Sequence, residues 1–237
     1  MDLFPSKGAH LTLGLVMHSF GNDTRILNKI TDGENKGLFE LALHGWQHKN
    51  YVNLSQQEQK TSLYKANEKL QMIFGNRSDM FIPPSNKFNN ATLAAIKELG
   101  IRILSSNLYE EYKFDQGNSI FTSNIKNDSG RIFQEIYHVP YTTAFKKFVG
   151  TAQIKLPVDE VARDINNKID KFGYAVVLIH PQSFIKLDKS ENYTDDVKKD
   201  VNQAQIDEKD IKDLEYLIDH LTQKGIEIST FHNLVDS

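Results

Sequence analysis

The sequence predicts an α/β protein in which parallel strands alternate with helices. Short apolar runs rich in β-forming residues, such as residues 10–17, 39–45 and 174–179, are bounded by turn residues. Between them lie longer segments whose apolar residues recur every three or four positions, as in amphipathic helices. Strands that alternate with helices through short turns imply parallel pairing with right-handed crossovers. The pattern alone leaves open whether the strands form a closed barrel or an open sheet.

Composition excludes several classes of function. With 237 residues, of which 39% are hydrophobic and 25% charged, the chain has material for one core, and we expect a single domain over residues 1–237. The net charge is only -3 and no Lys/Arg stripe stands out, which argues against a nucleic-acid partner. Cysteine is absent, which excludes disulfides, thiolate metal sites and a cysteine nucleophile. No apolar run approaches the roughly 20 residues of a membrane span, and residues 1–10 lack signal-peptide features.

The first half of the chain alternates regularly. Ser55 and Glu58 form a capping box before a long helix that Gly75 ends, and Asn89 begins a helix that Gly100 closes. The expected elements are, in order, a strand (10–17), a helix capped by residues 21–24 that runs to 29, a turn (32–37), a strand (39–45), a helix (55–75), a strand (80–82), a helix (89–99) and a strand (101–104).

The second half is less regular. Residues 105–139 contain only short β-like pieces, at 119–123 and 131–137, and we interpret about 105–140 as an insertion. The polar segment at about 186–206 is expected to be an exposed loop or a surface helix. The other expected elements are a helix (157–172), a strand (174–179), a helix (207–224) and a last strand (226–231).

Histidines gather at the predicted strand ends, where the loops of parallel α/β folds converge. His44 follows one strand and His48 lies four residues further on, a spacing that indicates a metal half-site because neutral imidazole is the commonest zinc ligand. The zincin motif shares this spacing but requires Glu where this chain has Gly45. The alternative for the pair is a hydrogen-bonded core histidine. His180 is either a buried residue at the Pro181 turn or an acid–base group.

Other candidate residues have simpler expected roles. Trp46, the only tryptophan, either lines a pocket or fills the core, and the core is the default. Asp23 is expected to cap a helix. Three histidines are expected to be surface or structural, and the pattern assigns no place to His138; the three are His10, His220 and His232.

The order of these motifs resembles that of the polysaccharide deacetylases, the chitooligosaccharide deacetylase homology family. The segments that carry the resemblance are LALHGWQH (41–48), FIPP (81–84) and LIH (178–180), and it covers about residues 1–235. It implies a distorted (β/α)7-type barrel. It also implies a metal-dependent hydrolase that removes acetyl groups from a polysaccharide or related glycan, with a divalent metal, expected to be zinc.

The resemblance also implies roles for particular residues. His44 and His48 would bind the metal, His180 would be the general acid that protonates the leaving amine, and the backbone N–H of Ser85 would stabilise the oxyanion. Zinc lowers the pKa of its bound water to about 7 and polarises the acetyl carbonyl. The substrate-binding residues assigned on the same basis are Trp46, Pro83 and Pro84.

The departures from the family pattern are equally specific. The Asp-Asp pair that supplies the catalytic base and the third metal ligand has no counterpart, so the chain is expected to be N-terminally truncated and its barrel to lack the first strand. Asp2 or Asp23 would be the substitutes for the third ligand. Gly45 stands where most relatives carry Ser or Thr, and Ile82 where many carry Arg.

Two alternatives to a deacetylase follow from these departures. One is a non-catalytic carbohydrate-binding relative or an inactive fragment. The other is an α/β domain whose histidines are structural. Family members often act outside the cytoplasm or at the cell envelope, although residues 1–237 contain no signal peptide.

Overall fold

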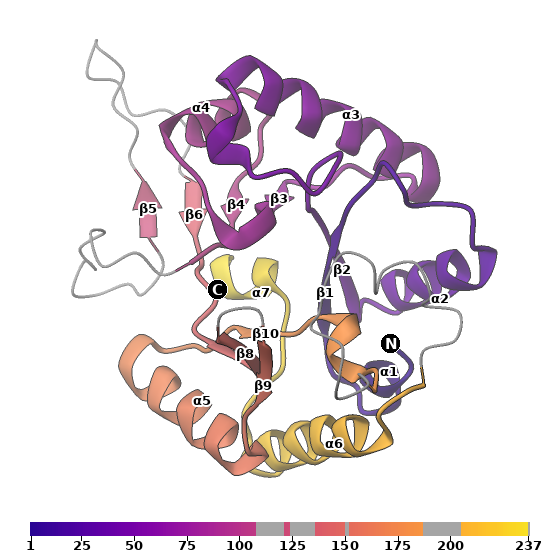
Figure 1. Cartoon of the computed structure of the whole chain (residues 1–237), viewed down its shortest axis with the longest axis vertical. Coiled ribbons are helices and arrows are strands. Elements are labelled where there is room, and N and C mark those ends of the chain that lie inside the picture. Colours follow the sequence, from indigo (N-terminus) through magenta and orange to yellow (C-terminus); the bar gives the residue numbers. More distant parts are fainter. Residues whose placement is uncertain (108–120, 124–135, 150–151, 187–204, 237) are drawn as a thin grey trace. The chain divides into compact units, whose positions relative to one another are not determined.

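A computed structural model of the chain describes residues 1–107, 121–123, 136–149, 152–186 and 205–236. The chain divides into two compact units, Met1–Pro140 with Ile228–Ser237, and Tyr141–Glu227. Figure 1 shows the elements of both units along the chain. The expected single domain stays a prediction. Most of the predicted insertion at about 105–140 and of the polar loop at about 186–206 lies outside the described residues.

The first unit is built on a six-stranded sheet. In spatial order its strands are β1 (Leu11–Leu15), β2 (Phe39–Leu43), β3 (Met80–Phe81), β4 (Ile103–Leu104), β6 (Ile136–His138) and β5 (Phe121–Ser123). All neighbours pair in parallel except β5, which is antiparallel to β6. The predicted α/β class with a parallel sheet is therefore confirmed. Among the described strands, no pairing closes this sheet into a barrel.

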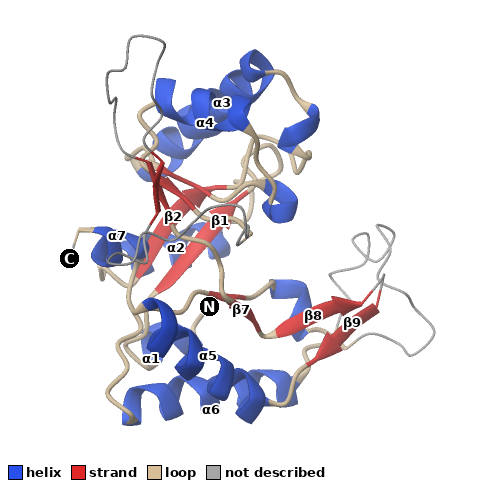
Figure 2. Ribbon diagram, turned by 90° about the vertical axis from the view of Figure 1, so that its left-hand side faces the viewer, coloured by secondary structure: helices blue, strands red, loops and turns tan. Residues whose placement is uncertain are grey.

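Helices connect these strands as the sequence predicts. The helices of the first unit are α1 (Leu3–Ser6), α2 (Thr24–Asn35), α3 (Gln56–Phe74), α4 (Asn90–Glu98) and α7 (Phe231–Val235). The capping box of Ser55 and Glu58 begins α3, and Gly75 ends it in the left-handed conformation. Helices α3 and α4 pack against each other on one side of the sheet (Figure 2). None of the described helices is long and apolar enough to span a membrane.

The main hydrophobic core lies between this sheet and its helices. Leu41 and Leu43 of β2 pack there with Leu63 and Leu70 of α3 and with Ile96 of α4. Each such side chain is almost completely removed from water, which stabilises the fold by about 1.5–3 kcal/mol per residue. The packing fixes the strands in place, and therefore also the loops at their ends.

The predicted turn at residues 32–37 is wrong over most of its length, because α2 continues through Asp32 and Gly33. Gly33 is buried against the ring of Phe39, and a Cβ atom at position 33 would lie 2.1 Å from Cδ2 of that ring. Only a glycine allows this close approach of helix and strand. The chain turns instead at Gly37, whose φ is 68°.

The predicted last strand at residues 226–231 is also wrong. Residues 226–230 form no strand, and α7 begins at Phe231 with Thr230 as its cap. The backbone N–H groups of Phe231 and His232 donate to the carboxylate of Glu40, both at 3.1 Å. These donors are therefore satisfied by a side chain, and a strand ladder is not formed.

The described residues of the second unit form two strand pairs and two long helices. Strand β7 (Thr143–Ala144) pairs in parallel with β10 (Val177–Leu178), and β8 (Lys146–Val149) forms an antiparallel hairpin with β9 (Ala152–Lys155). The helices α5 (Val158–Phe172) and α6 (Glu208–Gln223) match their predictions, and each buries an apolar stripe. The hairpin was not predicted. Lys146, on β8, forms an ion pair of 2.5 Å with the buried Asp210 of α6.

Candidate active site

The two histidines of the LALHGWQH segment lie side by side at the carboxyl end of β2. Their ring centroids are 5.0 Å apart and their planes are inclined by 59°. Nδ1 of His44 lies 2.6 Å from the carbonyl oxygen of Ile82, so its N–H donates to that oxygen and Nε2 carries the lone pair. Hydrogen bonds of this kind fix the tautomer and ring orientation of metal-ligating histidines. The geometry therefore suits a half-site for a metal, and the ligand role stays a prediction.

Backbone pairing continues beyond β1 and β2 and holds this loop in place. The N–H of His44 donates to Leu15 at 2.9 Å, and the carbonyls of Gly45 and Trp46 accept from Met17 and His18 at 3.2 and 2.7 Å. These bonds hold the segment after β1 beside the segment after β2 at one edge of the sheet. The position of His44 follows from the register of the parallel strands.

Gly45 has a specific reason to be glycine. Its φ is 85°, and a Cβ atom there would lie 2.8 Å from the hydroxyl oxygen of Tyr51. Tyr51 is fully buried and hydrogen-bonded to Ser62 at 2.7 Å. Burial raises the pKa of Tyr51 to about 12, so the hydroxyl stays protonated. The serine or threonine expected from the family pattern would clash with this hydroxyl.

We expect Gly45→Ser to lower the free energy of unfolding by about 1–3 kcal/mol, because it adds both a left-handed non-glycine residue and a steric clash. Urea denaturation measures this difference. In a Tyr51→Phe background the substitution should cost less, since the clashing hydroxyl oxygen is removed. Equal stability of Gly45→Ser and wild type would contradict the role assigned to Tyr51.

Trp46 lies partly buried against the core, next to the histidine pair. The ring of His18 meets it edge-on at 5.4 Å, and Nζ of Lys69 lies 5.7 Å from its centroid. Lys69 also donates to the carbonyls of Met17 and Phe20, at 2.8 and 2.6 Å. Lys69 was not among the predicted site residues, since a single lysine in an amphipathic helix carries no signal. The default core role of Trp46 fits this packing, and its role in substrate binding stays a prediction.

The loop after β3 contains two residues in an uncommon conformation. Ser85 and Asn86 have φ values of 60° and 54°, in the left-handed region that non-glycine residues seldom occupy. Asn86 N–H donates to Pro83 at 2.9 Å. Pro83 and Pro84 are buried whereas Ser85 is exposed. The roles assigned to these residues stay predictions, and strained turns of this kind are frequent at functional sites.

Another histidine of the first unit, His138, lies at the end of β6. Its Nε2 is 2.7 Å from Oγ of Ser106, which follows β4, and both side chains are buried. Burial lowers the pKa of His138 to about 4, so the imidazole is neutral near pH 7. This pair is at the same carboxyl edge of the sheet as His44. The place of His138 could not be predicted from the sequence, because its partner lies 32 residues away.

His180 belongs to the second unit, where it directly precedes a short 3-10 helix, Pro181–Phe184. Its carbonyl accepts from Ser183 at 2.9 Å, and its side chain is half-buried. One of its two expected roles was a buried residue capping the Pro181 turn: the turn is present, but His180 is only half-buried and its side chain makes no cap hydrogen bond. The role of general acid stays a prediction.

Asp2 and Asp23, the two predicted substitutes for the third metal ligand, both have other partners. Asp23 caps α2 through the backbone N–H of Arg25 and forms an ion pair with its guanidinium, which confirms the expected cap. Asp2 forms an ion pair with Lys29. Within the described residues, no group of three or more His, Asp or Glu side chains is arranged to hold a metal. The described part of the site therefore consists of two imidazoles.

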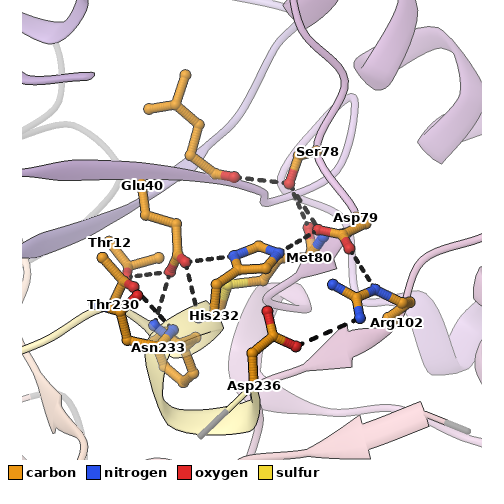
Figure 3. A network of polar contacts seen from close by, with 12 residues as sticks. Thr12, Glu40, Ser78, Asp79, Met80, Arg102, Thr230, His232, Asn233 and Asp236 are labelled. Carbon is orange, nitrogen blue, oxygen red and sulfur yellow. Dashed lines mark hydrogen bonds and ion pairs between the residues drawn. The ribbon is translucent and has the colours of Figure 1, made fainter. Parts of the chain in front are cut away.

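His232 lies in a charged network at the opposite, amino ends of the strands (Figure 3). Its Nδ1 is 2.6 Å from Glu40 and its Nε2 is 2.8 Å from Asp79, which is also paired with Arg102 at 2.8 Å. The carboxylates of Asp79 and Glu40 raise the pKa of His232 to about 10. The hydrogen bond from His232 lowers the pKa of Asp79 to about 2. The expected structural role of His232 fits this network, which attaches α7 to the sheet.

The fold and the site together define a class of protein, namely an α/β protein with a parallel sheet and a pair of histidines at the carboxyl end of one strand. The family model described as polysaccharide deacetylase matches residues 8–104, a range that includes His44, His48 and Ser85. This match confirms the expected resemblance to the polysaccharide deacetylases over residues 8–104. A comparison with curated proteins finds no match.

Several solved structures share the fold. A protein from Mycobacterium smegmatis assigned to the polysaccharide deacetylases is 16% identical, with a TM-score of 0.69 over 99% of this chain and 73% of the other. A peptidoglycan N-acetylglucosamine deacetylase is 14% identical, with a TM-score of 0.55 over 98% and 78%. A CE4 family pseudoenzyme from Bacillus anthracis is 15% identical, with a TM-score of 0.54 over 95% and 55%. At these identities the likeness concerns the fold.

Proposed function

We propose that this chain belongs to a metal-dependent hydrolase that removes acetyl groups from a polysaccharide or related glycan. The observation that carries the proposal is the His44–His48 pair, with Nδ1 of His44 held by the Ile82 carbonyl, inside the range that matches the family model. Two imidazoles suit a divalent metal such as zinc, and the remaining ligands would come from water, substrate or other residues. Action on glycans outside the cytoplasm, at the cell envelope, is part of the proposal.

The other residues have proposed roles that follow the family pattern. A bound zinc would polarise the acetyl carbonyl and supply hydroxide near neutral pH. The exposed Ser85 would donate its backbone N–H to the oxyanion, and His180 would protonate the leaving amine. The partly buried Trp46 would contact the glycan, and the buried Pro83 and Pro84 would shape the loop that contains Ser85.

A second candidate is a non-catalytic carbohydrate-binding relative. Two observations favour it: the described part of the chain offers no third metal ligand, and a pseudoenzyme is among the proteins of similar fold. This candidate predicts glycan binding that does not respond to chelators. The deacetylase predicts that chelators abolish activity and that zinc restores it.

The decisive experiment is elemental analysis of the purified chain after incubation with zinc. We expect about one zinc per chain in wild type and a loss of affinity of about 100-fold or more when His44 and His48 are both replaced by Ala. His220→Ala is the matched control, because it removes a histidine of α6 whose ring stacks on Tyr216. Acetate release from an acetylated chitooligosaccharide is then measured with and without chelator.

The outcomes separate the candidates. Zinc that depends on His44 and His48, together with chelator-sensitive acetate release, supports the deacetylase. Glycan binding without zinc or acetate release supports the carbohydrate-binding relative. Zinc retained by the double variant would contradict the half-site.

A further inference from the structure

The buried pair of Ser106 and His138 is the strongest polar feature near the site that the proposed chemistry does not use. Ser106 is completely buried and His138 is 4% exposed, and the hydroxyl and imidazole are 2.7 Å apart. With no access to solvent, the serine is unsuited to attack a substrate. Buried polar pairs of this kind specify one arrangement of the surrounding core, because their groups are costly to leave unsatisfied.

Two contacts connect this pair with the loop that contains Ser85. Asn107, the residue after Ser106, donates its N–H to the carbonyl of Asn86 at 3.2 Å. The ring of His138 meets that of Phe88 edge-on, with centroids 5.2 Å apart. The pair is therefore linked to the loop in two ways: by the backbone hydrogen bond of Asn107, which follows Ser106, and by the ring contact between His138 and Phe88.

The loop is in turn connected to the histidine pair. Asn86 N–H donates to Pro83, and the carbonyl of the preceding Ile82 accepts from His44. Ser85 and Asn86, at the centre of these contacts, are both left-handed. Non-glycine residues persist in that conformation only when the surrounding structure holds them there.

We propose that Ser106 and His138 are positioning residues that hold the left-handed turn of Ser85 and Asn86 in its place beside His44. The consequence for catalysis rests on the proposed function, since the turn would present the oxyanion-stabilising N–H of Ser85. The effect on the turn itself does not depend on any activity. The two parts of the proposal can therefore be tested separately.

The first test is amide hydrogen exchange. Ser106→Ala and His138→Phe both remove the hydrogen bond, and His138→Phe keeps a ring next to Phe88. We expect the Asn86 and Asn107 amides to exchange about tenfold faster in both variants, the ratio that corresponds to one net hydrogen bond. His138→Gln, which places an amide near Ser106, should keep most of the protection from exchange that wild type shows.

The control is a buried polar contact away from the loop. The side-chain amide of Asn67 forms two hydrogen bonds of 2.8 Å with the backbone of Ser78, which lies before β3. Asn67→Ala should leave the Asn86 and Asn107 amides protected. Unchanged protection in Ser106→Ala, or equal acceleration in Asn67→Ala, would overturn the proposal. Exchange of the α3 amides shows in each variant that the core is folded.

The second test applies to the catalytic consequence. With N-acetylated chitotetraose as substrate, kcat of Ser106→Ala should fall about tenfold while KM and zinc content stay within about twofold of wild type, and His138→Gln should recover part of kcat. If wild type is inactive, the proposed function fails and the exchange result alone decides on the positioning role. If kcat is unchanged although exchange accelerates, the turn is not part of the catalytic machinery and the catalytic part is overturned.

Discussion

Replacing His232 by Ala is expected to lower the free energy of unfolding by about 2 kcal/mol. The imidazolium lies between the carboxylates of Glu40 and Asp79, at 2.6 and 2.8 Å. Its loss leaves the Glu40 carboxylate without a cationic partner, whereas Asp79 keeps its ion pair with Arg102 at 2.8 Å. Removal of one partner from a fully buried pair costs about 3–5 kcal/mol. The expected cost here is smaller, because the side chains of His232 and Asp79 are 34% and 32% exposed.

Urea denaturation of the whole chain measures this cost. His10→Ala is the matched control, since Nδ1 of His10 donates to a backbone carbonyl, that of Ile228, at 2.6 Å. A neutral hydrogen bond of this kind should contribute about 1 kcal/mol. Glu40→Gln in the His232→Ala background should recover stability, because it removes the carboxylate charge that has lost its cationic partner. Equal losses of unfolding free energy in His232→Ala and His10→Ala would contradict a stabilising role for the charge of His232.

Stability as a function of pH is expected to have a maximum near pH 6.5, because two histidines of the first unit have opposite pKa shifts. The pKa of His138 is lowered to about 4 by burial, and that of His232 is raised to about 10 by Asp79 and Glu40. A histidine with a lowered pKa loses its contribution as the pH falls from 6.5 to 4. A histidine with a raised pKa contributes fully below pH 6.5 and loses its contribution between pH 6.5 and 10.

The slope of each side of the maximum follows from the number of protons involved. One proton corresponds to at most about 1.4 kcal/mol per pH unit, and partial exposure of His232 reduces the slope on the alkaline side. Asp79, with its pKa lowered to about 2, adds a further loss as the pH falls from 3.8 to 2. Thermal denaturation between about pH 2 and 10 measures the whole curve.

Two variants assign the two sides of this curve. His138→Phe should flatten the acid side, since no imidazole remains to be protonated on unfolding. His232→Gln should flatten the alkaline side in the same way. If both variants keep the slopes of wild type, other groups set the pH dependence and the two histidines are wrongly assigned.

The sequence by itself determined the features whose causes are local. The capping box of Ser55 and Glu58 and the glycine at 75 set both ends of α3, because helix ends are decided within a few residues. The alternation of apolar runs and amphipathic segments gave the parallel α/β class. The spacing of His44 and His48 was enough to predict that two imidazoles would meet, and their rings do lie 5.0 Å apart.

Only the tertiary structure decided the features that depend on distant residues. Asp32 and Gly33 form a helix and not a turn, because Phe39 packs where a Cβ would be. The segment before α7 is not a strand, since Glu40 takes its N–H groups from 191 and 192 residues away in the chain. Burial and charge pairing at such separations leave no local pattern of residues. For the same reason the pairs of His232 and of His138 became visible only in the folded chain.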